Sequence, residues 1–139
     1  MTALDEVVAA LLSCVQAALA GTPGGAVDRV CDVPGRLAWD DCQCGLLAVT
    51  VDRVFPSATF PVEAFDEMLT AACPPPYEAV DVTVTVLRCA PNMDSRGNPP
   101  TCAELAAAAE VWAFDIEAVR VAVVCCLAGL VDAGTVEEW

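Results

Sequence analysis

The sequence predicts an α+β domain in which an N-terminal helix and a long second helix pack on one face of an antiparallel sheet. Three observations predict this fold. They are an amphipathic segment near the N-terminus, a strictly alternating segment over residues 80–89, and an apolar stripe along residues 101–127. Because the chain has 139 residues, we expect one domain spanning residues 1–139.

The first helix is expected to begin after Thr2. Threonine is a good N-cap, and Asp5 and Glu6 place negative charge in the first turn. The Gly- and Pro-rich residues 21–45 end the helix and predict an irregular connection, with room for a short strand around Val30. Apolar residues recur along the helix at spacings of three and four, namely Leu4, Val7, Val8, Leu11, Leu12, Val15 and Leu19.

Two segments predict strands. Residues 46–55 alternate, and Pro56 ends them; one face carries Leu47, Val49, Val51 and Phe55. Residues 80–89 alternate more strictly, and their apolar face carries Val80, Val82, Val84 and Val86. This alternation predicts an antiparallel sheet with one covered face. Between the strands, Pro61 and the apolar residues up to Leu69 predict a short helix.

The second helix is expected to start with a capping box formed by Thr101 and Glu104. Its apolar stripe is predicted to cover the valine face of the sheet. Gly129 is the natural terminator, and residues 135–139 are typical of the start of another strand. The stripe consists of Leu105, Ala109, Trp112, Ile116, Val119, Val123 and Leu127.

The composition restricts the classes of partner. Six Arg, no Lys, no His and twenty acids give a formal charge of −14, which disfavours tight binding to nucleic acid phosphates. Solubility alone also favours acids on a chain that is 57% hydrophobic. Acids rather than cations precede the first apolar segment, and no charge-free run spans a bilayer. We therefore expect a protein made and assembled in the cytoplasm, with no membrane partner.

The sequence offers little for catalysis. Without His and Lys, the usual general base, Schiff base and phosphate clamp are missing. The acid pairs at residues 40–41 and 137–138 are most simply solvated loop residues. We expect no enzyme activity, no catalytic residue and no cofactor. A small cysteine-dependent enzyme is a distant alternative.

The chain has nine cysteines, which are candidates for metal ligands and for disulfide partners. One residue separates Cys42 from Cys44, no second pair matches them and His is absent, so no metal site is expected. Cys14, Cys125 and Cys126 fall within helices and are interpreted as small core residues. Disulfides that form outside the reducing cytoplasm would come from Cys31, Cys42, Cys44, Cys73 and Cys102.

Contacts with other subunits are expected at three places. The polar face of the second strand is one, the loop over residues 91–100 is another, and a tryptophan beside two acids is the third. The candidate contact residues are Trp39, Asp81, Thr83, Thr85, Asn92, Asp94 and Arg96.

Several segments resemble small head-to-tail connection proteins of long-tailed actinobacterial phages. They are residues 81–91, 94–100 and 102–105, with 39–42 and 4–8 adding to the likeness. The Ala- and Val-rich, Lys-free composition is typical of proteins from GC-rich phage genomes. The order of elements is similar to that of the tail terminator family, which includes the terminator of phage lambda. In that family a Gly/Cys-rich strand region follows the second helix, whereas this sequence ends at Trp139.

The resemblance implies a structural protein of the virion, located in the tail and neck. It implies a homo-oligomeric ring, expected to be a hexamer, that caps a tube of major tail tube protein and meets a head-side stopper protein. Genomic DNA would pass through without specific binding, since six copies carry −84, six times −14, and an acidic wall offers phosphates no contact. The alternative is another neck ring. A stopper is usually a small β-barrel, which the long helix disfavours, and an adaptor is mainly helical, which the strands disfavour.

Overall fold

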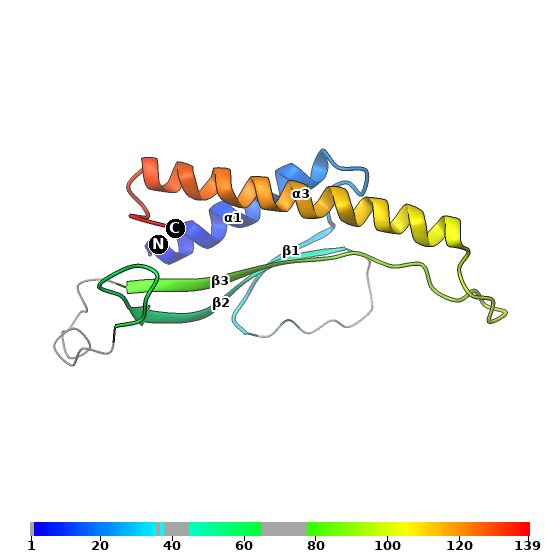
Figure 1. The fold of residues 1–139 in the computed structure, drawn as a ribbon, viewed down its shortest axis with the longest axis horizontal. Helices are drawn as coiled ribbons and strands as arrows, with labels where there is room; N and C mark the ends of the chain where they lie inside the picture. Colours follow the sequence, from blue (N-terminus) through cyan, green and yellow to red (C-terminus); the bar gives the residue numbers. More distant parts are fainter. Residues whose placement is uncertain (1, 36, 38–44, 65–77) are drawn as a thin grey trace.

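The computed structural model describes residues 2–35, 37, 45–64 and 78–139. Its elements are helix α1 (Ala3–Ala20), strands β1 (Arg29–Val33), β2 (Leu46–Pro56) and β3 (Glu78–Leu87), and helix α3 (Cys102–Asp132). The strands form a sheet in the order β1-β2-β3, and both helices lie over the same face of it (Figure 1). The predicted α+β fold with two helices on one face is confirmed.

Both helices begin with a capping box, as predicted. The Thr2 hydroxyl accepts a hydrogen bond from the Asp5 amide at 3.2 Å, and the Asp5 carboxylate accepts one from the Thr2 amide at 2.8 Å. Thr101 and Glu104 repeat this arrangement at the start of α3. At its other end α3 continues past Gly129 to Asp132, because a single glycine costs a helix only about 1 kcal/mol.

The sheet is mixed rather than antiparallel. β2 pairs antiparallel with β3, placing Leu47 opposite Val86 and Val49 opposite Val84. β1, the short strand expected around Val30, pairs with β2 in parallel. A parallel pair requires a connection of about a dozen residues or more, and residues 34–45 supply that length.

A register shift between Val51 and Arg53 reverses the alternation along β2. Before the shift, Leu47 and Val51 face the helices together with their partners on β3. Beyond it, Phe55 lies opposite Ala79 on the other face, where the Arg53 guanidinium stacks 4.3 Å from its ring centre. The prediction that Phe55 shares a face with Leu47 was wrong, because one extra residue in a strand exchanges its two faces.

The core lies between α1 and β2. Helix α1 buries Val8, Leu11, Val15 and Leu19, and β2 is buried from Leu46 to Thr50. The valines of β3 were predicted to be buried and are only partly so, from Val80 to Val86. By length and composition α1 is apolar enough to cross a membrane, but its four buried side chains pack against the sheet and α3 as in a core helix.

Two other predicted elements differ. No strand forms over residues 133–139, where backbone amides of Gly134 and Thr135 instead bond carbonyls of the last turn of α3. Most of the short helix predicted after Pro61 lies outside the described residues, and Thr59 and Val62 form an isolated antiparallel bridge before it.

A disulfide between Cys14 and Cys126 joins α1 to α3 across 112 residues of sequence. These two cysteines were interpreted as small core residues, so their pairing corrects that interpretation. Cys31 and Cys102, two candidates for disulfides, are free thiols. Cys125 is free and exposed, so its interpretation as a core residue was wrong. Cys89 is disulfide-bonded. The candidates Cys42, Cys44 and Cys73 lie outside the described residues.

Replacing Cys126 with Ala is expected to lower the free energy of unfolding by about 2–5 kcal/mol, because the disulfide closes a long loop in the unfolded chain. Urea unfolding without reductant measures this change. Cys125→Ala removes the neighbouring free thiol and serves as the matched control, expected to change stability by less than about 0.5 kcal/mol. Equal stability of the two variants would contradict a stabilising disulfide.

Candidate subunit interface

Helix α3 is longer than the sheet that it covers. Its 31 residues extend about 46 Å, whereas the 10 residues of β3 extend about 33 Å. Figure 1 shows the N-terminal part of α3 reaching past the end of β3, with the connecting chain beneath it. No described strand therefore underlies the first turns of this helix.

The predicted apolar stripe of α3 is divided by this overhang. Val119, Val123 and Leu127, in the second half, pack against the core. In the first half, Trp112 is 53% exposed and Ile116 is 59% exposed, and Leu105 is exposed as well. The prediction that the whole stripe is buried was wrong for this half. Leu105 lies in the overhanging first turn, and Trp112 and Ile116 line an open groove beside the edge strand β3.

A groove of about 290 Å³ runs between β3 and α3, and we call it the β3–α3 groove. The side chains of Arg88 and Asp115 are 13% and 7% exposed and form its floor, while Arg120, at 64%, stands at its edge. The walls of the groove are apolar, which suits an apolar surface better than a small polar ligand. Those walls are Val84, Val86, Trp112, Ile116 and Val119.

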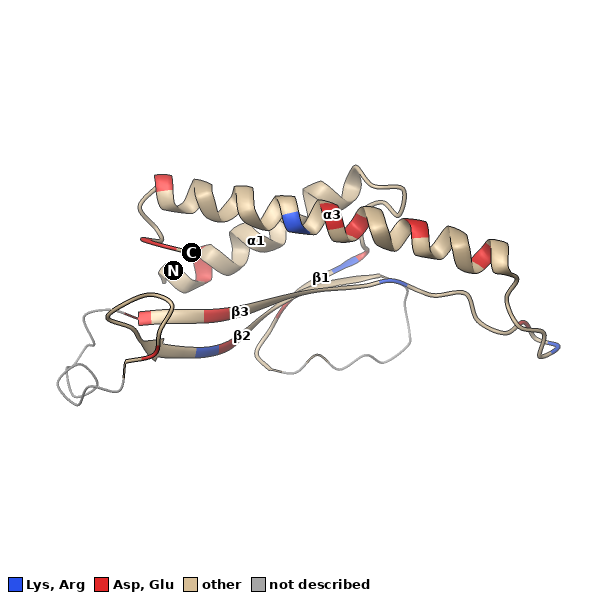
Figure 2. Ribbon diagram, viewed as in Figure 1, with Lys and Arg blue, Asp and Glu red and all other residues tan. Residues whose placement is uncertain are grey.

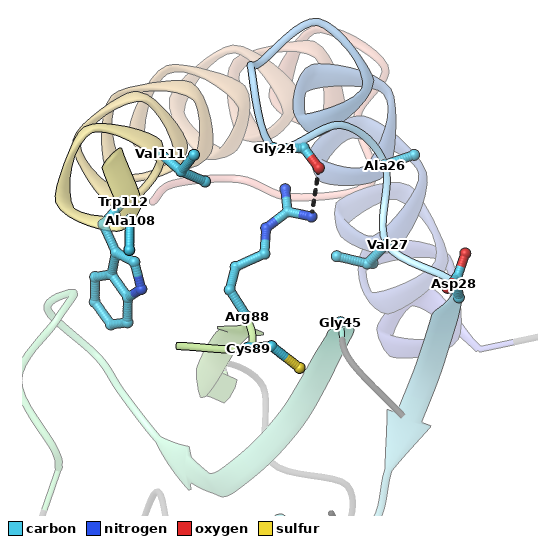
Figure 3. A pocket seen from close by; sticks show the side chains of 10 residues that line it. All are labelled: Gly24, Ala26, Val27, Asp28, Gly45, Arg88, Cys89, Ala108, Val111 and Trp112. Atoms are coloured by element: carbon cyan, nitrogen blue, oxygen red, sulfur yellow. Dashed lines mark hydrogen bonds between the residues drawn. The ribbon is translucent and has the colours of Figure 1, made fainter. Parts of the chain in front are cut away.

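The floor of the groove is a buried ion pair. Arg88, directly after β3, donates from Nε to Asp115 Oδ2 at 2.8 Å and from Nη2 to Asp115 Oδ1 at 3.2 Å. Its guanidinium also donates to the carbonyls of Gly24 and Gly25, and Thr22 Oγ1 donates to Asp115 Oδ1 at 2.8 Å. The pair thus joins the end of β3, the middle of α3 and the turn after α1. Figure 3 shows the Arg88 guanidinium pointing to the Gly24 carbonyl of that turn.

A second cavity of about 330 Å³ lies between Arg88, the start of α3 and residues 24–28 (Figure 3). Arg88 and Trp112 border both cavities. A Cβ at Gly24 would lie 2.8 Å from Val111 Cγ1 and 2.9 Å from Arg88 Nη2, so a larger residue there would push against the ion pair. Within the described ranges no group of three or more acids or cysteines is placed to hold a metal ion.

The predicted contact residues of β3 lie on the face opposite the helices. Asp81 forms an ion pair with Arg53, and Thr83 donates a hydrogen bond to Asp52. Both are exposed, whereas Thr85 is half-buried. Their polar groups are therefore largely engaged within the sheet. Trp39 lies outside the described residues.

Asn92, Asp94 and Arg96 lie in the loop beyond the first turn of α3, at the opposite end of the molecule from the start of β3 (Figure 1). The Asp94 carboxylate accepts hydrogen bonds from the Arg96 and Asn98 amides and from Asn98 Nδ2, at 2.8–2.9 Å. These bonds, the side chain of Asn98 first, hold the pKa of Asp94 below its ordinary value. The structure therefore does not bring the loop candidates together with those on β3.

The sequence reasoning missed the β3–α3 groove and its floor. Trp112 and Ile116 were assigned to the core, and Asp115 was not singled out. A comparison of the helix length with the strand length would have shown that the first turns of α3 extend beyond the sheet. No sequence pattern pairs Arg88 with Asp115, because they are neighbours only in the folded chain.

Asp115→Asn is expected to lower the free energy of unfolding by about 3 kcal/mol, because it leaves the Arg88 charge largely buried without a counter-ion. Glu117→Gln breaks the exposed ion pair with Arg120 two residues further along and is the matched control. Its expected cost is less than about 0.5 kcal/mol. Urea unfolding of both variants checks this, and similar losses would refute the importance of the buried pair.

The Asp94 carboxyl is expected to titrate below the ordinary value of about 3.9. Because folding lowers the pKa of Asp94, its ionised carboxylate stabilises the folded state at pH values above the unfolded-state pKa. That stabilisation is lost as the pH falls through the folded-state pKa. The amide signals of Arg96 and Asn98 should shift with the same low midpoint in an NMR titration. A midpoint at or above the ordinary value would show that the loop bonds do not hold in solution.

Comparisons with protein-family models, with curated proteins and with solved structures find no match to this chain.

Proposed function

We propose that this protein is a structural subunit of a long-tailed phage virion, a tail terminator that forms a homo-oligomeric ring at the end of the tail tube. The observation that carries the proposal is the exposed apolar surface on the first half of α3. Trp112 and Ile116 are more than half exposed there, beside an apolar groove. A long helix that is apolar on several sides is normally buried, so this surface requires a partner.

The order of elements also supports the proposal. A helix, a sheet and a long helix that covers the sheet follow one another along the chain, as the resemblance to tail terminators implies. The rigid attachment of α3 to the sheet through Arg88 and Asp115 holds its exposed half in a fixed position. A subunit that must repeat around a ring needs such a fixed surface.

The charge suits a channel for DNA. Acidic residues are spread along α3 and the strands, and basic residues are few (Figure 2). Three of the six Arg, namely Arg53, Arg88 and Arg120, are already paired with acids of the same chain. A ring of such subunits presents few cations to phosphates. The release of counterions that drives DNA binding is therefore small, and DNA can pass through without being held.

The test is to mix the purified full-length protein with polymerised tail tubes and image them by electron microscopy. We expect a ring at tube ends and an arrest of tube growth. Native mass measurement of the free protein gives the number of subunits. A monomer that never associates with tube ends would reject the proposal, and binding to the head-side neck alone would favour the stopper or adaptor alternative.

A further inference from the structure

We propose that copies of this chain associate head to tail, with the outer side of α3 from one copy seated in the β3–α3 groove of the next. This inference rests on the proposed ring and deepens it by naming the two surfaces that meet. Each surface is visible in a single copy, and they lie on different sides of the same helix.

The outer side of α3 carries a second apolar surface, formed by Phe114, Val121 and Cys125, which we call the outer patch. Phe114 is 49% exposed, Val121 is 44% exposed and the Cys125 thiol is free. These positions recur at spacings of seven and four, so they share one side of the helix. At about 100° per residue, Phe114 lies about 200° from Trp112, which places the outer patch opposite the groove.

The charges around the two surfaces are complementary. Glu110 and Glu117 flank the outer patch, while Arg120 stands at the edge of the groove. Glu117 and Arg120 now pair within one helix at 2.7 Å, with side chains 63% and 64% exposed. Because such exposed pairs contribute little, they can exchange partners across a contact at small cost.

The exposed apolar area calls for a second copy. Six large apolar side chains of α3 are exposed and together leave roughly 500 Å² of apolar surface in water, divided between the two sides of the helix. A standard interface buries about 800 Å² on each partner, so a stable contact must bury the polar rim around each patch as well. The six exposed side chains are those of Leu105, Trp112, Phe114, Ile116, Val121 and Val124.

A head-to-tail contact also explains why there are two surfaces. A two-fold contact buries the same patch on both copies and would leave the other in water. A groove-to-patch contact covers both surfaces on every copy of a closed ring. The net charge of −14 on each copy opposes association, so we expect the contact to strengthen as salt screens that repulsion.

The test uses two full-length variants and their mixture. Ile116→Asp disables the groove and Phe114→Asp disables the outer patch, and both side chains are about half exposed, so the core is left intact. We expect each variant alone to remain monomeric, with association weakened about 30-fold or more. A 1:1 mixture should form heterodimers and nothing larger, because one intact groove then meets one intact outer patch.

The matched control is Val62→Asp, which places the same charge at a side chain that is 63% exposed and lies outside α3. It should assemble like the wild type. Native mass spectrometry at several concentrations and salt levels gives the size of each species, and circular dichroism verifies the fold.

Three results would overturn the inference. Dimers of Phe114→Asp alone would show a two-fold contact through the groove, wild-type-like assembly of both variants would place the contact elsewhere, and a monomeric wild type would remove it. Its failure can be separated from that of the proposed function. Heterodimers without capping of tail tubes reject only the function, and capped tubes without heterodimers reject only this contact.

Discussion

The buried pair of Arg88 and Asp115 fixes where the long helix lies on the sheet. It fastens the middle of α3 to the end of β3, and the Cys14–Cys126 disulfide fastens the second half of α3 to α1. Between these two attachments the helix packs against the core. Its first turns have no described strand beneath them and extend beyond the sheet (Figure 1).

This overhang links stability to function. The packed half supplies a rigid body, and the overhanging half presents apolar side chains in a fixed geometry. A free monomer leaves them in water, whereas the proposed assembly would bury them. The free energy of that assembly would then come from surface that contributes nothing to the fold of one copy. In the proposed ring, the acidic charge would keep unassembled copies apart and keep DNA from adhering to the channel.

The sequence predicts those parts of the fold that depend on local patterns. Thr2 and Thr101 mark the helix starts because capping is local, and the alternation over residues 80–89 marks a strand because it is a period of two. The parallel pairing of β1, the shift after Val51 and the pair of Arg88 with Asp115 depend on neighbours distant in sequence. The contact residues predicted from the sequence lie mainly in polar segments. The exposed apolar surface instead lies on a helix whose sequence pattern is that of a core helix.

The most direct measurement of the central claim is photo-crosslinking from position 114. A photoreactive phenylalanine analogue replaces Phe114, and equal amounts of protein with light and heavy nitrogen are assembled, irradiated and digested. The account predicts mixed-isotope crosslinks from position 114 to the tryptic peptide that contains Val84 and Val86. Mixed crosslinks that join two position-114 peptides, or crosslinks confined to one chain, would contradict it.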